Sequence, residues 1–334
     1  MASIIDTFIE QAKKNPKRVA FPECDNEIMM TAAFQVQESG IGTSVMVGDG
    51  AKLKELCVER GFDPSKVEIV DVNDEAYTAD LVKRYVDDPN TMLKEKGVRR
   101  RIADPMYYAM AMEAVGDVDI TFAGINCPTG DVIQAGITMV GLAEGIATPS
   151  SIGLFEIPGY EGSQGNLLVF GDSAVCVNPD AEQLADIAIS ACTTVADLLK
   201  WDPKCALLSF STTGSAQHEL LEKVIAAKGI ANEKRPDLKI DGEFQLDAAI
   251  NPKVGKKKVK HESEVAGQAN IIIWPDLNAG NIGVKLVQFF AGADAYGPIL
   301  QGFRKVVCDC SRSAPVSEIV GNVAMSVIRA GAND

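Results

Sequence analysis

The chain has 334 residues, of which 46% are hydrophobic, and this size predicts two domains, or one large α/β domain with a partner lobe. Its 32 basic and 46 acidic side chains give a formal net charge of −14, which repels nucleic-acid backbones and anionic lipid surfaces. The composition therefore argues against nucleic-acid and membrane partners.

Helical and strand patterns alternate through the first part of the chain. Apolar residues at helical spacing predict an opening helix around Ile5, Phe8, Ile9 and Ala12, and "RVAFPE" after it predicts a strand. The alternation then continues through a helix over 28–40 closed by Gly40, a strand over 43–48, a helix over 51–61, a strand over 67–72, a helix over 104–116, a strand over 118–124 and a loop over 125–136. This order predicts parallel strands with helical crossovers.

A second α/β pattern follows "TPSS", which interrupts the first near Ala147 to Ser150. Two β-rich runs, 150–159 and 166–177, predict adjacent strands. Further elements follow in the order helix 181–199, strand 204–211, loop 212–217, helix 218–229, strand 269–275, loop 276–281, helix 282–292, strand 305–311 and a last helix. The sequence thus predicts an α/β protein in both halves.

The cysteines and histidines bear on compartment and metal binding. The eight cysteines lie mostly in apolar runs, which is typical of reduced, buried thiols in a cytoplasmic protein. The two histidines, His218 and His261, have no metal-ligand spacing, so no metal site is expected. The opening segment is too polar for a signal peptide, and no stretch has the length of a membrane span.

One run of like charge, "KVGKKKVKHE" over 253–262, stands out. A solvated basic loop is the favoured interpretation, because such runs are common on exposed surfaces. The alternative is an electrostatic contact with the phosphates of a nucleotide-like ligand.

Polar residues gather where strands are predicted to end. No Gly-x-Gly-x-x-Gly follows the first strand and no P-loop motif occurs, which argues against the common nucleotide folds. The polar clusters are "STTGSA" (211–216), "DGEFQLDAA" (241–249), "PDLNAGN" (275–281), "GPILQG" (297–302) and "DCSRS" (309–313). Ligands bind at the carboxyl ends of strands in open α/β sheets, and small residues there let backbone N–H groups approach an anion.

The order and spacing of these clusters resemble the phosphate acetyl/butyryltransferase (phosphotransacetylase) family over nearly the whole chain, as a divergent member. The resemblance is carried by "FPE" (21–23), "GDVD" (116–119), "AGINCPTGD" (123–131), "LLSFSTTGSA" (207–216), "IDGEFQLDAAI" (240–250), "VAGQANIIIWPDLNAGNIGVKLVQ" (265–288), "GADAYGPILQG" (292–302) and "DCSR" (309–312).

The resemblance implies two α/β/α domains with mostly parallel sheets and a cleft between them. It places domain I at 1–147 plus 297–334 and domain II at 148–296. It further implies a homodimer and an acyl exchange between coenzyme A and phosphate that yields acyl phosphate. Coenzyme A would be a substrate, with no permanently bound cofactor and no metal.

The resemblance also implies the site residues. Ser311 and Arg312 match the family's serine–arginine pair, which suits an oxyanion, and Glu318 falls where the family has its base, usually Asp. Locally, the alternative is that Arg312 pairs with Asp309 or a neighbouring carboxylate to hold the turn. The expected substrate-binding residues are Gly124, Asp131, Gln134, Ser211, Thr212, Thr213, Ser215, Asp276, Asn278, Asn281 and Gln301.

Three cations of the family pattern are missing. Gln134, Thr213 and Leu93 stand where arginine, lysine and arginine are expected. Arg99, Arg100 and Arg101 could restore the charge, or could form a solvated helix start. Three functions stay open on these residues: a phosphate acyltransferase, which is preferred; an acyl-coenzyme A enzyme with a non-phosphate acceptor; and a non-catalytic acyl-coenzyme A-binding module.

Overall fold

The computed structural model describes residues 3–333. The chain divides into two compact units, of which unit 1 is Met1–Ala143 with Phe303–Asp334 and unit 2 is Glu144–Gly302. The sequence predicted divisions at 147/148 and 296/297. The second division lies later because strand β10 (Asp294–Gln301) pairs antiparallel with β5 (Ser150–Glu156) along its length, and so it stays in unit 2.

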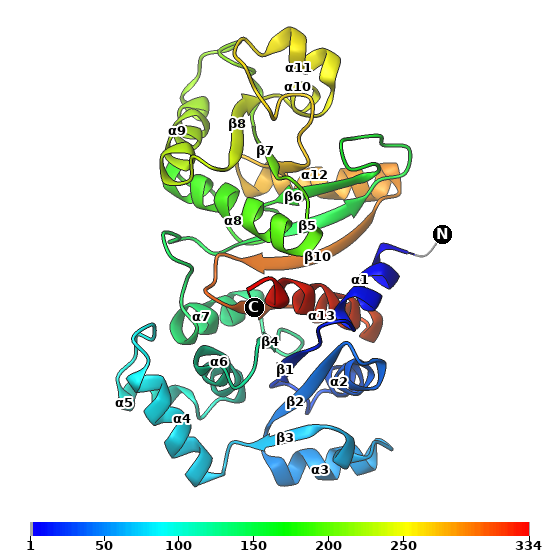
Figure 1. Ribbon diagram of the computed structural model, residues 1–334, viewed down its shortest axis with the longest axis vertical. Helices are drawn as coiled ribbons and strands as arrows, with labels where there is room; N and C mark the ends of the chain where they lie inside the picture. The colour runs from blue at the N-terminus through cyan, green and yellow to red at the C-terminus, as the bar shows by residue number, and fades with distance from the viewer. Residues whose placement is uncertain (1–2, 334) are drawn as a thin grey trace. The chain divides into compact units, whose positions relative to one another are not determined.

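Unit 1 is built on a five-stranded parallel sheet of order β11-β4-β1-β2-β3. Its strands are β1 (Lys17–Phe21), β2 (Gly42–Gly48), β3 (Glu68–Asp71), β4 (Ile120–Phe122) and β11 (Val306–Cys308). Its helices are α1 (Ile4–Ala12), α2 (Glu27–Ser39), α3 (Gly50–Glu59), η1 (Pro64–Lys66), α4 (Glu75–Asp87), α5 (Glu95–Arg101), α6 (Pro105–Val115), α7 (Thr129–Met139), α13 (Val316–Ala330) and η2 (Gly331–Asn333). The unit therefore joins the two ends of the chain in one sheet (Figure 1).

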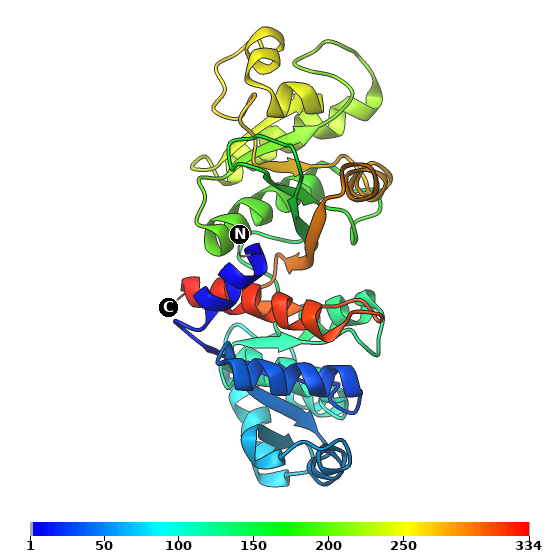
Figure 2. The same ribbon diagram turned by 90° about the vertical axis from the view of Figure 1, so that its right-hand side faces the viewer.

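Helices cover both faces of this sheet. Helices α2 and α13 pack on one face, with α1 against α13, and α6 packs on the other beside α4 and α7 (Figure 2). Local signals explain the ends: Asn26 caps α2 and Gly40 ends it at a φ of 74°, while Asp104 caps α6 ahead of Pro105. Helices α1, α2, α6 and α13 are elements that the sequence predicted, whereas α4 was not predicted.

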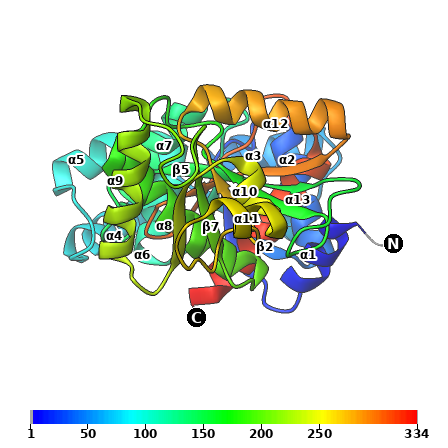
Figure 3. The ribbon, with the colours of Figure 1, turned by 90° about the horizontal axis from the view of Figure 1, so that it is seen from above.

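Unit 2 has a six-stranded sheet of order β10-β5-β6-β9-β7-β8, antiparallel across β10, β5 and β6 and parallel beyond. The remaining strands are β6 (Leu167–Gly171), β7 (Lys204–Leu208), β8 (Lys239–Phe244) and β9 (Ile271–Ile273), and the helices are α8 (Ala181–Leu199), α9 (Glu219–Lys234), α10 (Leu246–Ile250), α11 (Pro252–Lys258) and α12 (Leu277–Ala291). Helices α8 and α9 pack together on the sheet, which α10 and α12 also contact (Figure 3). The prediction of two α/β/α units with mostly parallel sheets is confirmed.

Several predicted loops are helical. The expected loop 276–281 is the first turn of α12, because Asp276 accepts a hydrogen bond from Ala279 N at 3.0 Å and caps the helix. Helix α7 begins at Thr129, inside the expected loop 125–136, and the basic run begins in α11, which Asn251 caps. The prediction of a basic loop over the whole run is therefore wrong.

Two further expectations on helix ends need correction. The segment 99–101 closes α5 instead of starting a helix, so three arginines lie at the negative end of the helix dipole, where cations are favourable. Helix α9 continues past Gly229 to Lys234.

Within residues 3–333, no helix combines the length and the apolar character needed to cross a membrane.

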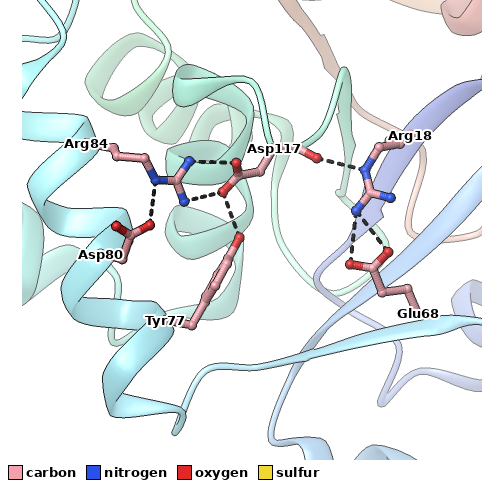
Figure 4. Close-up of polar contacts among 6 residues, drawn as sticks. All are labelled: Arg18, Glu68, Tyr77, Asp80, Arg84 and Asp117. Carbon is pink, nitrogen blue, oxygen red and sulfur yellow. Dashed lines mark hydrogen bonds and ion pairs between the residues drawn. The ribbon is translucent and has the colours of Figure 1, made fainter.

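A polar network ties α4 to the loop before β4 in unit 1 (Figure 4). The Asp117 carboxylate accepts from both terminal nitrogens of Arg84, at 2.6 and 2.7 Å, and from the Tyr77 hydroxyl at 2.7 Å. Its backbone carbonyl accepts from Arg18 Nε at 2.8 Å, and Arg18 also pairs with Glu68. Burial raises the pKa of Asp117, but the hydrogen bonds from Arg84 and Tyr77 outweigh it and the net pKa is lowered.

Replacing Asp117 with Asn should lower the free energy of unfolding by about 1–2 kcal/mol at pH 7, because charged hydrogen bonds are lost at a partly exposed site. Since the folded pKa is depressed, this contribution is present above the unfolded pKa of about 4 and is lost as pH falls below it. Urea unfolding of both proteins at pH 7 and pH 3 measures the difference. A gap that persists undiminished at pH 3 would contradict this assignment.

Candidate active site

Ser311 and Arg312 lie in unit 1, on the segment between the end of β11 and the start of α13. Both side chains are exposed, as is Ser313. The Ser311 and Ser313 hydroxyl oxygens lie 3.0 Å apart, and Ser311 O accepts from Ala314 N at 2.9 Å, which closes a tight turn. The turn thus presents a hydroxyl and a guanidinium to solvent from neighbouring positions.

Arg312 is not used to hold this turn. Within residues 3–333 it forms no ion pair, and Asp309, the partner that the local alternative proposed, accepts instead from the Thr129 hydroxyl at 2.5 Å. The pairing of Arg312 with Asp309 is therefore wrong. An exposed guanidinium that pairs with no carboxylate is available to bind an anionic ligand.

Asp309 is a buried acid beside this turn. Burial raises the pKa of its carboxyl to about 6, although the hydrogen bond from Thr129 lowers it. Its Oδ1 atom has no hydrogen-bond partner in the described chain. A Cβ atom at Gly124, whose φ is +106°, would lie 2.1 Å from that oxygen, so only glycine fits at position 124.

The loop after β4 is held by a second acid, Glu23. This side chain is 8% exposed and accepts backbone N–H groups from Gly124 at 2.7 Å, Ile125 at 2.9 Å and Asn126 at 3.2 Å. The carboxylate occupies the position that an anion would take over these N–H groups. Gly124 therefore supports this loop because it has no side chain and adopts a positive φ, while its N–H is already paired with Glu23.

The other expected residues of unit 1 lie on α7 and α13. Asp131 and Gln134 are exposed on α7, and Gln134 Nε2 donates to Thr138 Oγ1 at 3.0 Å. Glu318 is half-buried in the first turn of α13, and burial raises the pKa of its carboxyl. A carboxyl with a raised pKa is suited to taking up a proton near neutral pH.

In unit 2 the turn 211–216 does not offer free N–H groups. Every backbone N–H from Ser211 to Ala216 donates to a neighbour: the acceptors are Ser209 Oγ, Ser215 Oγ, Glu243 O, Glu243 Oε1, Thr212 O and Ser211 Oγ. The expectation that these N–H groups bind an anion is wrong for this turn. Any anion contact here must come from side chains.

The expected side chains of this turn divide into two sets. Ser211 and Thr212 are buried, and the Ser211 hydroxyl donates to Glu243 Oε1 at 2.8 Å, so they hold the turn. Ser215 is exposed, and Thr213 is half-buried with its hydroxyl donating to the backbone carbonyl of Lys258 at 3.1 Å. Thr213 thus stands where the family pattern has lysine, and its hydroxyl binds the backbone of Lys258.

The remaining expected residues of unit 2 lie at the start of α12 and at the end of β10. Asp276 caps α12, and Asn278 and Asn281 are exposed in its first turns. Gln301 is fully buried at the end of β10, and its Nε2 donates to Ser150 Oγ at 2.9 Å and to Ile187 O at 3.2 Å. Gln301 therefore joins the edge of the sheet to α8.

Two of the three arginines proposed as replacements contact neighbouring side chains of unit 1, and the third, Arg100, is exposed. Arg99 donates to Glu95 at 2.8 Å along the exposed face of α5, and Arg101 lies 5.6 Å from the centre of the Tyr107 ring. Leu93 lies in the loop that precedes α5 and contacts the helix near Gly97. These contacts give the replacement hypothesis no support.

Sequence reasoning missed four residues that shape these loops: Glu23, Thr129, Glu243 and Lys258. The acids Glu23 and Glu243 lie in "FPE" and "IDGEFQLDAAI", two of the stretches that carry the resemblance, which is a signal that could have been used. Lys258 lies in the basic run 253–262, whereas Thr129 carried no signal, because its partner Asp309 is 180 residues away.

Comparison with known proteins identifies the family. The family model described as phosphate acetyl/butaryl transferase matches residues 3–327. A phosphate acetyltransferase of Clostridium acetobutylicum is 40% identical over 332 residues, covering 98% of each chain. The solved structures of a phosphotransacetylase from Streptococcus pyogenes and of EutD phosphotransacetylase from Staphylococcus aureus are each 30% identical in sequence, with TM-scores of 0.87 and 0.86. They cover 99% and 98% of this chain, and it covers 99% of each of them. The chain belongs to the phosphate acetyl/butaryl transferase family.

Proposed function

We propose that this chain is a phosphate acetyltransferase, an enzyme that exchanges an acetyl or another short acyl group between coenzyme A and inorganic phosphate. The observation that carries the proposal is the exposed, carboxylate-free Arg312 beside Ser311 in a member of this family. Coenzyme A is a substrate that leaves at each turnover, with no permanently bound cofactor, and the enzyme works in the cytoplasm.

The proposed step is an acyl transfer through a tetrahedral intermediate. A phosphate oxygen attacks the thioester carbon, the carbonyl electrons move to oxygen, and the resulting oxyanion accepts hydrogen bonds from Arg312 and the Ser311 hydroxyl. Collapse breaks the carbon–sulfur bond, giving acyl phosphate and the coenzyme A thiolate, which takes up a proton. The reverse direction needs a base for the thiol, and Glu318 is assigned that role.

Glu318→Gln should slow transfer from acyl phosphate to coenzyme A by about 10²-fold, because a positioned general base contributes that much or more. The pKa of Glu318 is raised, so the wild-type rate should rise with pH as this carboxyl ionises, and the variant should lose this limb of the profile. Steady-state rates between pH 4 and pH 8 measure both effects. Ser317→Ala, an exposed neighbour, is the control, and a variant with wild-type rate and pH profile would place the base elsewhere.

The proposed function is tested by following thiol release from acetyl-coenzyme A with phosphate, with arsenate and with neither. Release that requires phosphate or arsenate supports the proposal. Release with a neutral acceptor but not with phosphate would indicate a changed acceptor. Binding of acetyl-coenzyme A without release under any condition would indicate a non-catalytic binding module.

The enzyme is further proposed to be a homodimer that associates through α12. One face of this helix carries Ile282, Leu286, Phe289 and Phe290, which are 58, 50, 83 and 86% exposed. Exposed apolar side chains at this spacing are typical of a protein–protein contact, and the adjoining edge strand β10 has one unpaired side within its sheet. A second copy of the same surface would cover both.

Replacing Phe289 and Phe290 together with Glu should convert the dimer to a monomer, because each interface would then bury four carboxylates in an apolar contact. Light scattering coupled to size exclusion measures the mass. Val58→Glu, at a 67% exposed position of α3, is the control and should stay dimeric. A Phe289/Phe290 variant that keeps the dimer mass would exclude α12 as the contact.

A further inference from the structure

A pocket of about 390 Å³ lies within unit 1, where strands β1 and β2 end. The chain runs from β1 outward to β2 and β3 and then crosses to β4 on the other side of β1, so the strand order reverses beside β1 (Figure 1). In open parallel sheets, ligands bind outside the carboxyl ends of the strands at such a reversal. Ser311 and Arg312 do not line this pocket, since they follow β11, which β4 separates from β1. The pocket therefore has no assigned role in the acyl transfer.

The floor of the pocket is apolar and fixed. Val47, Leu53 and Met106 line it and are 1, 4 and 8% exposed. Pro22 and Pro105 add two rings that lose almost no side-chain entropy when they are covered. A preformed apolar floor of this kind can take a flat ring at little entropic cost.

Two carboxylates at the rim are held in place by helix ends. Asp49 follows β2 and caps α3, where its Oδ1 atom accepts from Lys52 N at 3.0 Å. Asp104 caps α6, where its Oδ1 atom accepts from Met106 N at 2.8 Å. Within residues 3–333, no hydrogen bond or ion pair occupies the Oδ2 atom of either carboxylate. Each therefore offers an oriented acceptor to a ligand.

The place of Asp49 in the sheet suits a sugar. In doubly wound sheets that bind nucleotides, a carboxylate of the second βα unit accepts hydrogen bonds from ribose hydroxyls. Asp49 stands in the second βα unit of this sheet, directly after β2, and its side chain is exposed. A ribose ring at this point would present its hydroxyls to a fixed carboxylate.

The charges in the pocket argue against a phosphate. The carboxylates that line it are those of Glu23, Asp25, Asp49 and Asp104, and the one cation among its lining residues is Lys52. Glu23 also accepts the loop N–H groups that could otherwise bind an anion. Lys52, which forms no ion pair within residues 3–333, opposes an ammonium ligand but can donate to a hydroxyl or a ring nitrogen. A neutral ligand with hydroxyl groups fits these charges better than a phosphate or an organic cation.

We propose that this pocket binds a nucleoside without phosphates, with the base on the apolar floor and the ribose hydroxyls donating to Asp49 and Asp104. The site goes beyond the proposed function and does not depend on it. It is distinct from any site for coenzyme A, because the phosphates of that substrate would face the lining carboxylates.

Calorimetry with adenosine as the probe tests the site in the full-length chain. Excess coenzyme A is present, so that adenosine is displaced from any coenzyme A site, and binding of adenosine to the parent should persist. Asp49→Asn and Asp104→Asn should each raise the Kd about tenfold, as expected for one lost charged hydrogen bond. Asparagine still caps a helix, so a thermal melt of each variant should match the parent. Asp74→Asn, at the exposed cap of α4 outside the pocket, is the matched control and should bind as the parent does.

Adenosine 5′-monophosphate tests the exclusion of phosphates. It should bind at least about tenfold more weakly than adenosine, because its phosphate would face the carboxylates. Tighter binding of the monophosphate would overturn the proposal.

Other outcomes would also overturn it. Loss of adenosine binding in excess coenzyme A would assign the adenosine to a coenzyme A site. Equal affinities in the parent, Asp49→Asn and Asp104→Asn would place the adenosine outside this pocket. Displacement of adenosine by spermidine would show that the pocket selects an organic cation. Absence of adenosine binding in the parent would show that the pocket takes no nucleoside.

Discussion

Arg312→Ala is expected to lower kcat by about 10²–10³-fold, and Ser311→Ala by a comparable or smaller factor, because each removes a donor to the oxyanion. Neither change should alter the thermal midpoint by more than about 2 °C, since both side chains are exposed and Arg312 pairs with no carboxylate in the described chain. Rates in both directions and a thermal melt of each variant measure the two effects. The loss should appear in kcat more than in KM, because the contact forms with the intermediate.

Arg312→Lys is the informative companion. A lysine keeps the charge but lacks the planar pair of donors, so it should recover only part of the lost rate. Arg235→Ala, which breaks an exposed ion pair with Asp237 on unit 2, controls for the general loss of an arginine. If Ser311→Ala and Arg312→Ala both worked at the parental rate, this turn would not be the active site.

Glu23→Ala is expected to reduce both stability and activity. It leaves the buried N–H groups of Gly124 and Ile125, and the partly buried one of Asn126, without their acceptor, which should cost about 3 kcal/mol of unfolding free energy. The loop 124–126 meets the Asp309 segment next to Ser311, so a small shift there should lower kcat by at least about tenfold. Chemical denaturation and steady-state kinetics at pH 7 measure the two losses.

Glu23→Gln keeps one acceptor oxygen and should recover part of both losses. Glu38→Ala, at an exposed position on α2, should change neither quantity appreciably. A Glu23→Ala protein as stable and as active as the parent would mean that this loop needs no carboxylate to hold its shape.

The sequence predicted the fold well where local signals and tertiary packing agree. Gly40 ends α2 as predicted, and the apolar runs of β1, β2 and β4 are buried strands of unit 1. Prediction failed where small polar residues are common both in loops and in the first turn of a helix. The "DLNAGN" segment has the composition of a loop, yet Asp276 caps it as the first turn of α12.

The sequence names candidate residues for the site but not the partners that hold their loops. Ser311 and Arg312 could be identified from their motif, and the structure leaves Arg312 free of Asp309. The acceptors of the loop N–H groups could not, because Glu23 and Gly124 are 101 residues apart and Ser211 and Glu243 are 32 apart. Local sequence cannot show that an N–H group is already paired with so distant a carboxylate.

The central claim is that this chain exchanges acetyl groups between coenzyme A and phosphate at Ser311 and Arg312. Incubating the enzyme with acetyl phosphate, coenzyme A and [³²P]phosphate tests it directly, since isotope enters acetyl phosphate only through reversible transfer. The account predicts incorporation that requires coenzyme A and falls by at least about 10²-fold in Arg312→Ala. Incorporation absent from the parent, or undiminished in that variant, would contradict it.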